Sequence, residues 1–277
     1  MSGTRVLEEK EGVPAQAPVQ VPALECRSIE RRFGGLVALA GVDLRVERGE
    51  IFGLVGPNGS GKTTLINAVT GFFPPQRGSI YLYGEDITGQ APHRIARRGV
   101  ARTFQNLALF NGMTVLDNIL LGRHVHMRPG VLRTALYPWL ALPEEIANRR
   151  VVEDVIDFMQ LERVRDEPVD VLPLGLKKRV ELARALVAEP RFLVLDEPMA
   201  GMNQEEKEYM ARFVLDAREE RGVTVLLIEH HMDIIVGICD RMLVLSYGEV
   251  IESGVPREVI ADPRVVKAYL GGVHVAA

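Results

Sequence analysis

The chain has 277 residues, of which 47% are hydrophobic and 25% charged, and its formal net charge is −4. That length allows a sizeable core in one large domain, or in one domain with a subdomain. The charge balance gives no bulk basic excess of the kind that points to nucleic acid as a partner. Cys26 and Cys239 lie far apart and match no metal or disulfide spacing, so we expect a reduced, cytosolic protein with two buried thiols.

No apolar run reaches the roughly 18 to 20 residues that span a bilayer, and the N-terminus lacks a secretory pattern. Residues 1–21 show no periodicity and contain several prolines and charges, which predicts a disordered tail. We assign residues 22–272 to the folded domain and residues 273–277 to a short C-terminal tail.

From Ala23 onward, short strand-like runs alternate with helical ones. ALECRSI, VDLRV, EIFGLV and SIYLYG are expected to be strands, and LINAVTGFF a helix. The region from about 107 to 188 is mostly helical. Thr114 followed by Asp117 is a capping-box pattern, and Pro143 with two glutamates is expected to open a second helix.

The α/β alternation returns after this helical region. FLVLDE and TVLLIE are typical of strands buried on both faces, with a helix between them that ends at Gly222. MLVLSYGEVIESG predicts a hairpin around Tyr247 and Gly248, and VPREVIAD and PRVVKAYLG predict two terminal helices.

The segment GPNGSGKT follows a predicted strand and precedes a predicted helix, which is the context of a phosphate-binding loop. Its glycines allow consecutive backbone N–H groups to surround phosphate oxygens, and the helix dipole adds to that field. Lys62 is expected to reach the β- and γ-phosphates, and the Thr63 hydroxyl to ligate Mg²⁺. The expected ATP-binding residues of this loop are Gly56, Pro57, Asn58, Gly59, Ser60, Gly61, Lys62, Thr63 and Thr64.

The strand FLVLDEP supplies an acidic pair at its carboxyl end. Asp196 is placed to hold Mg²⁺, directly or through water, and Glu197 to polarise the attacking water as general base. Such a pair is a weak signal alone, because acidic residues often simply end strands. Together with the glycine-rich loop it predicts a P-loop NTPase.

Three further residues fit the same chemistry. Gln105 follows a short strand and could ligate Mg²⁺ and sense the γ-phosphate. His230 directly follows a buried strand, and its imidazole could hydrogen-bond the γ-phosphate and the attacking water. Phe33 could stack on a base. Taken singly, each has a plainer interpretation as a surface amide, a structural cap or a core aromatic.

In this order and spacing, the elements resemble the ATP-binding subunit of an ABC transporter over about residues 23 to 272. Phe33 matches the aromatic A-loop, GPNGSGKT the Walker A motif and Gln105 the Q-loop. LPLGLKKRVELARAL falls at the signature sequence, FLVLDE at Walker B, PMAGMN at the D-loop and His230 at the switch histidine. The resemblance implies an α/β P-loop NTPase core with an antiparallel β subdomain and an inserted helical subdomain.

Longer stretches are similar to the branched-chain amino acid uptake branch: RRFGGLVAL, GVARTFQNLALFNGMTVLDNILLG, AGMN, LLIEHHMDII and ADPRVVKAYLG. This resemblance implies a peripheral subunit on the cytoplasmic face of the cell membrane. Its partners would be two membrane permease subunits, a second ATP-binding subunit and, indirectly, a solute-binding protein. Two such subunits, alike or different, would face head to tail and enclose two ATP molecules with Mg²⁺. The branch also includes transporters of urea and short amides, so the solute stays open.

The signature departs from the family's usual Leu-Ser-Gly-Gly-Gln. Pro173 replaces the serine, Leu174 the first glycine and Leu176 the glutamine, while Leu172 and Gly175 match. Pro173 offers a phosphate neither a hydroxyl nor an N–H group. We therefore expect the contact with the partner subunit's ATP to use backbone N–H groups from Leu174 onward and the helix dipole. A lost hydrogen bond to a charged group would weaken that contact by about 1.5 to 3 kcal/mol.

Other readings are a non-transport ABC ATPase and a nucleotide-binding regulator without turnover. Chromosome-maintenance types need long coiled coils between Walker A and Walker B, and no heptad run is present here. Intact Glu197 and His230 argue against the regulator. His231 stands where this branch usually has aspartate, and we expect that change to matter little.

Overall fold

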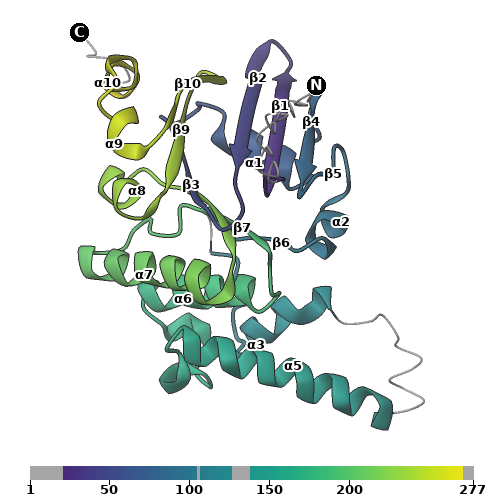
Figure 1. The fold of residues 1–277 in the computed structure, drawn as a ribbon. Coiled ribbons are helices and arrows are strands. Elements are labelled where there is room, and N and C mark those ends of the chain that lie inside the picture. Colours follow the sequence, from purple (N-terminus) through teal and green to yellow (C-terminus); the bar gives the residue numbers. More distant parts are fainter. Residues whose placement is uncertain (1–20, 105–106, 127–137, 271–277) are drawn as a thin grey trace, which may run out of the picture.

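The computed structural model describes residues 21–104, 107–126 and 138–270, which form two β-sheets and a helical lobe (Figure 1). The expected tails and Gln105 lie outside these residues, except that Val21 is described. The strands are β1 (Leu24–Phe33), β2 (Leu36–Val46), β3 (Ile51–Val55), β4 (Arg77–Leu82), β5 (Glu85–Asp86), β6 (Val100–Arg102), β7 (Phe192–Asp196), β8 (Thr224–Ile228), β9 (Arg241–Ser246) and β10 (Glu249–Gly254).

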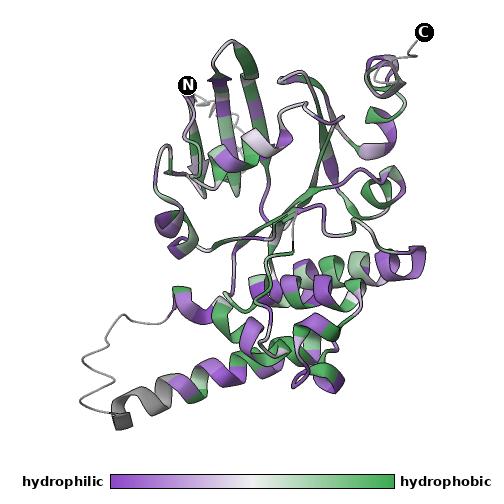
Figure 2. Cartoon of the chain, turned by 180° about the vertical axis from the view of Figure 1, so that it is seen from behind, coloured by the Kyte–Doolittle hydropathy of each residue, from purple (hydrophilic) through white to green (hydrophobic). Residues whose placement is uncertain are grey.

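The larger sheet has the strand order β10-β9-β3-β8-β7-β6. Its strands β6, β7, β8, β3 and β9 are parallel, and β10 joins β9 in the antiparallel hairpin that the sequence predicts. All residues of β3, β7 and β8 are buried, as expected for strands covered on both faces, and these strands are largely hydrophobic in Figure 2. Because the strands are parallel, their carboxyl ends meet at one edge.

The smaller sheet is antiparallel, with the order β2-β1-β4-β5. The helices are α1 (Lys62–Val69), α2 (Pro92–Arg97), α3 (Val115–Leu120), α5 (Pro138–Phe158), α6 (Leu174–Leu186), α7 (Gln204–Arg221), α8 (Met232–Ile238), α9 (Pro256–Val259) and α10 (Pro263–Leu270). Short 3-10 helices lie at η1 (Leu121–Val125), η2 (Glu162–Val164) and η3 (Val169–Val171). Helix α3 packs on both α5 and α6, which places the helical lobe below the sheets in Figure 1.

Alternate residues of β7 face two different cores. Leu193 and Leu195 pack with the helices α3, α5, α6 and α7, whereas Phe192 and Val194 pack with α1 and the small sheet. Cys26 and Cys239 are buried in these cores as free thiols, as expected, and burial raises the pKa of both well above the ordinary value for cysteine.

Two helix ends follow the sequence signals, and one does not. Thr114 caps α3 by accepting a hydrogen bond from the backbone N–H of Asp117, and Gly222 ends α7 with φ 65°. The prediction that Pro143 opens α5 is wrong, because the helix already begins at Pro138. The helix instead begins at a different proline, Pro138, in keeping with the preference for proline at a first helical position.

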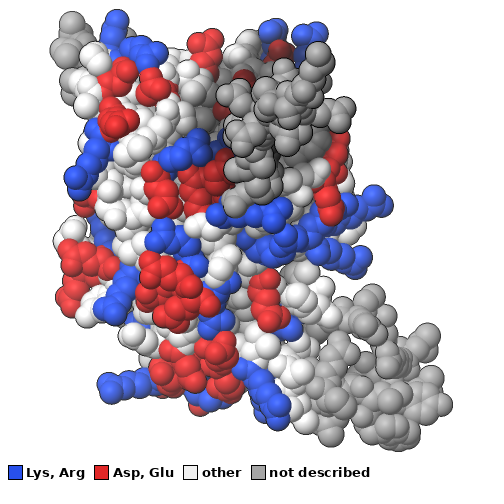
Figure 3. All heavy atoms as spheres, viewed as in Figure 1, with Lys and Arg blue, Asp and Glu red and all other residues white. Residues whose placement is uncertain are grey.

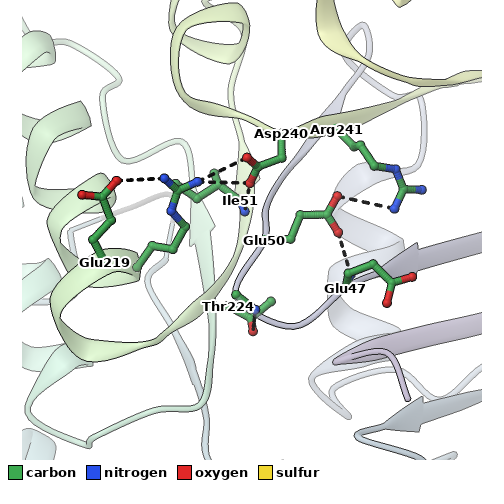
Figure 4. Close-up of polar contacts among 9 residues, drawn as sticks. Glu47, Glu50, Ile51, Glu219, Thr224, Asp240 and Arg241 are labelled. Atoms are coloured by element: carbon green, nitrogen blue, oxygen red, sulfur yellow. Dashed lines mark hydrogen bonds and ion pairs between the residues drawn. The ribbon is translucent and has the colours of Figure 1, made fainter. Parts of the chain in front are cut away.

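The amino-terminal edge of the large sheet is held by a separate polar network (Figure 4). The buried carboxylate of Glu50 accepts a hydrogen bond from the backbone N–H of Glu47 at 2.6 Å and pairs with Arg241 at 3.4 Å. Asp240 accepts a hydrogen bond from the backbone N–H of Ile51 at 2.9 Å. These contacts join the starts of β3 and β9, at the edge opposite the predicted phosphate site.

Among the helices that the structure describes, none is both long and apolar enough to pass through a membrane.

Candidate functional site: the phosphate loop and the carboxyl edge

The predicted phosphate loop joins the end of β3 to the start of α1. Gly56 has φ 152° and Gly61 has φ 109°, a region that favours glycine. A Cβ atom at Gly61 would lie 2.6 Å from the carbonyl oxygen of Ala38, and one at Gly56 would overlap the carbonyl oxygen of Leu245. The loop therefore needs glycine at both positions, for backbone conformation as well as for space.

Lys62 is buried at the first position of α1, and its ammonium group is held inside the loop. Its Nζ donates to the carbonyl oxygens of Gly56 at 2.7 Å and Pro57 at 3.1 Å. Burial lowers the pKa of Lys62, while the carboxylates of Glu197 and Asp196 oppose that shift. The loop lysine and the acidic strand end are thus close enough to interact electrostatically.

The other predicted loop residues divide into buried and accessible groups. Ser60 is buried, and within the described residues its hydroxyl has no hydrogen-bond partner. Asn58, Gly59 and Thr63 are exposed, and Thr64 is half-buried. The Thr63 hydroxyl is therefore accessible at the amino-terminal end of α1, as a metal ligand there would need to be.

Asp196 ends β7 and is bound by an arginine that the sequence did not single out. Arg102 Nη2 donates to Asp196 Oδ2 at 2.9 Å, and Arg102 Nη1 donates to Asn67 Oδ1 at 2.6 Å and to the hydroxyl of Thr70 at 3.3 Å. The sequence places this arginine at the end of the short strand before Thr103. Arg102 thereby connects β6, β7 and α1.

Glu197 and His230, each expected to be catalytic, are in direct contact. His230 Nε2 lies 2.5 Å from Glu197 Oε1, and the two residues follow the adjacent parallel strands β7 and β8. Glu197 has φ 51°, an uncommon backbone conformation for a residue with a Cβ atom, which is typical of functional sites. The arrangement brings a carboxylate and an imidazole together at the carboxyl edge of the sheet.

Glu229 is a further residue of this edge that the sequence did not predict. It follows β8 and is 1% exposed. Its Oε1 accepts from the backbone N–H of Met199 at 2.9 Å, and its Oε2 accepts from the backbone N–H of His230 at 3.2 Å and from His231 at 3.0 Å. In the sequence, Glu229 is marked only by its position between a buried strand and the two histidines His230 and His231.

Pro173 is the N-cap residue of α6, with φ −62° and ψ 159°, and no side chain caps this helix. The first backbone hydrogen bond of the helix runs from the N–H of Lys177 to the carbonyl oxygen of Pro173. The N–H groups of Leu174, Gly175 and Leu176 precede that bond, so they are the ones available to an anion. Leu174 is 38% exposed.

Phe33 lies at the end of β1, where the residue is 41% exposed. Its described ring contacts are an edge-to-face arrangement with Phe73 at 5.9 Å and a cation–π contact with Arg31 at 4.9 Å. The structure thus leaves part of the ring accessible. Gln105, the predicted γ-phosphate sensor, lies outside the described residues.

Comparison with known proteins is consistent with this geometry. The family model described as ABC transporter matches residues 39–200, and the one described as branched-chain amino acid ATP-binding cassette transporter matches residues 249–275. A relative from Pseudomonas aeruginosa, the high-affinity branched-chain amino acid transport ATP-binding protein BraF, is 40% identical over 253 residues, covering 90% of this chain and 98% of the relative. The corresponding LivG protein of Escherichia coli is 37% identical over 257 residues, with the same coverage.

Solved structures are similar over the same extent. An ATP-binding cassette of an ABC transporter in its ADP conformation has a TM-score of 0.79 and 34% sequence identity, and the match covers 90% of this chain and 99% of that one. A nucleotide-free ATP-binding cassette gives the same TM-score at 33% identity, covering 90% of this chain and 98% of that one. The expected fold class is therefore confirmed. This chain belongs to the ABC transporter family, as one of its ATP-binding cassettes.

Proposed function

We propose that this chain binds and hydrolyses ATP as the ATPase subunit of an ABC importer that takes up branched-chain amino acids through partner permeases. The observation that carries the proposal is the Glu197–His230 contact at the carboxyl edge, beside a phosphate loop of the required shape. The relatives named for branched-chain amino acid transport support the choice of solute.

The residues of the site fit ATP and Mg²⁺. The loop is a cradle that Cβ atoms would fill, and within the described part of the chain the buried hydroxyl of Ser60 lacks a partner. Lys62 would exchange its bonds to loop carbonyls for phosphate oxygens. Thr63, Asp196 and Gln105 would hold Mg²⁺, which neutralises charge on the phosphates during transfer. This donor set of hydroxyl, carboxylate and amide oxygens suits a hard cation.

Hydrolysis would use the pair at the edge of the sheet. Glu197 would accept the proton of the attacking water, and His230 would orient Glu197 and hydrogen-bond the γ-phosphate. The ATP of a second subunit would meet the start of α6, where Pro173 leaves only backbone N–H groups at Leu174 and Gly175 and the positive end of the helix dipole.

A groove beside the helical lobe supports the permease as a partner. It has a volume of about 660 Å³ and lies between α2, β6, η1 and α6. Its wall includes exposed aromatic rings at Phe72, Phe104 and Phe110. Helix α2 carries Arg94 and Arg97, and basic side chains gather around it in Figure 3. An apolar groove with a basic rim suits a short amphipathic segment from a cytoplasmic loop of a membrane subunit, which would place the chain at the cytoplasmic face of the membrane.

The test is reconstitution of the chain with its membrane subunits and binding protein, followed by ATPase and uptake assays with branched-chain amino acids, urea and short amides. Branched-chain amino acids should stimulate ATP hydrolysis and accumulate in vesicles. Stimulation by urea or amides alone would overturn the solute assignment, and absence of ATP hydrolysis would overturn the ATPase itself.

A further inference from the structure

Glu229 connects the two loops that carry the catalytic pair. One of its carboxylate oxygens accepts from the N–H of Met199, two residues after Glu197, and the other accepts from the N–H of His230. The backbone hydrogen bond from the N–H of Glu197 to the carbonyl oxygen of Ile228 also joins these segments, and Glu229 adds the side-chain contacts that reach Met199 and His230. If that carboxylate moves, the loop after Glu197 and the loop at His230 lose these shared hydrogen bonds, and the distance between the two side chains can change.

A buried carboxylate needs a compensating positive charge, because leaving it unpaired in the interior is costly. No cation contacts Glu229 directly among the described residues. Instead, His231 Nδ1 lies 3.0 Å from Glu229 Oε2, and Lys207 Nζ lies 2.8 Å from His231 Nε2. Lys207 is in the first turn of α7, the helix that follows the Glu197 loop.

The geometry sets the hydrogen positions in this chain of contacts. An ammonium group can only donate, so His231 Nε2 must carry a lone pair towards Lys207. Its Nδ1 then carries the hydrogen and donates to Glu229. The imidazole is neutral in this arrangement, and its dipole carries the influence of the lysine to the buried carboxylate.

We propose that Lys207 and His231 are positioning residues for ATP hydrolysis. Through Glu229 they hold the Glu197 and His230 loops in the alignment that the reaction needs. The inference rests on the proposed ATPase function. It also gives a role to His231, at which this chain departs from the aspartate usual in the branch.

The kinetic test compares the full-length protein with Lys207→Met, Lys207→Arg and His231→Asn. Lys207→Met removes the positive charge, whereas Lys207→Arg keeps a charge and a hydrogen-bond donor. His231→Asn keeps a donor to Glu229, but its shorter side chain cannot also contact Lys207. Lys267→Met, on the exposed face of α10, is the control with the same change of charge.

Lys207→Met and His231→Asn should each lower kcat about tenfold, the size expected for a lost hydrogen bond to a charged group, with KM for ATP changed less than twofold. Lys207→Arg should restore most of kcat, and Lys267→Met should match the wild type. Because both residues act through one chain of contacts, the double variant should be no worse than the single ones. An unchanged kcat in Lys207→Met, additive losses, or a rise in KM alone would overturn the inference.

Two measurements do not depend on turnover. Nitrogen-15 shifts of His231 in the wild-type protein should show the Nδ1–H tautomer, and the Nε2–H tautomer would overturn the inference. Hydrogen exchange at the amides of Met199 and His230 should be faster in Lys207→Met than in Lys267→Met, whereas equal rates would count against it. If the wild type hydrolyses no ATP but these results hold, the proposed function fails and the structural link stands.

Discussion

Arg102 and Asp196 form an almost wholly buried ion pair across β6 and β7, with a separation of 2.9 Å and side chains that are 9% and 6% exposed. The guanidinium also lies 5.2 Å from the ring centre of Phe104 and 5.9 Å from that of Phe72. Both rings line the groove beside the helical lobe. Arg102 therefore connects Asp196, the expected Mg²⁺ ligand, to the groove proposed to contact the permease.

Arg102→Met should destabilise the protein by about 3 kcal/mol, because removing one partner leaves the other charge buried and unpaired. Addition of Mg²⁺ with a non-hydrolysable ATP analogue should recover more stability in this variant than in the wild type, since Asp196 then regains a cation. Denaturant unfolding with and without these ligands measures both effects.

Arg77→Met is the control for that experiment. The Arg77 side chain is 79% exposed and forms an ion pair with Glu30 at the longer distance of 3.8 Å. Exposed pairs of this kind contribute about 1 kcal/mol or less. Equal unfolding midpoints for Arg102→Met and Arg77→Met would show that the buried pair has no structural role.

Glu197→Gln should lower ATP hydrolysis by about a hundredfold or more while leaving ATP binding intact, because the amide cannot accept the proton of water. The variant should accumulate an ATP-bound dimer that size-exclusion chromatography can detect. Rapid turnover in Glu197→Gln would contradict the general-base role, and loss of ATP binding would indicate a disturbed loop instead.

Pro173→Ser should stabilise the protein by about 1 kcal/mol, because a serine hydroxyl can accept a hydrogen bond from the first turn of α6, where no side chain caps the helix. In the assembled transporter it should also raise ATPase activity by strengthening contact with the second subunit's ATP. Thermal unfolding and steady-state ATPase assays separate the two effects, and unchanged turnover would show that this position does not limit hydrolysis.

Glu181 provides a pH-dependent prediction. Burial raises the pKa of its carboxyl group, although Lys178 at 3.8 Å opposes the shift. The folded state therefore binds this proton more tightly than the unfolded state, and the contribution of Glu181 to stability falls as the pH rises through the raised pKa. Above about pH 4, the free energy of unfolding measured with urea should fall less with rising pH in Glu181→Gln than in the wild type. Parallel curves would contradict the burial effect.

The local elements of the site were predictable because each has a signal in adjacent residues. The glycines and lysine of the phosphate loop, the cap at Gly222 and the hairpin at Tyr247 and Gly248 all follow from short-range backbone chemistry. The catalytic roles of Glu197 and His230 were expected from the motifs, but a direct contact between the two was not predicted. Its 2.5 Å geometry depends on β7 and β8 being neighbours in the sheet.

The partners of the buried charges could not be predicted in this way. Arg102 meets Asp196 only because β6 pairs with β7, and Lys207 meets His231 only because the first turn of α7 lies beside the loop after β8. Such pairs are set by tertiary packing between segments far apart in the sequence. We expected little from the change to histidine at position 231, yet its side chain joins a lysine to a buried carboxylate.

The start of α6 packs closely against the start of α7. A Cβ atom at Gly175 would overlap the carboxylate of Glu206, and that carboxylate is held by the capping box in which it accepts from the N–H of Asn203 at 3.0 Å. The backbone at Gly175 therefore packs directly against a side chain of the first turn of α7, the helix that follows the loop after Glu197. A shift of the start of α6 towards a neighbouring subunit's nucleotide would therefore act first on the start of α7.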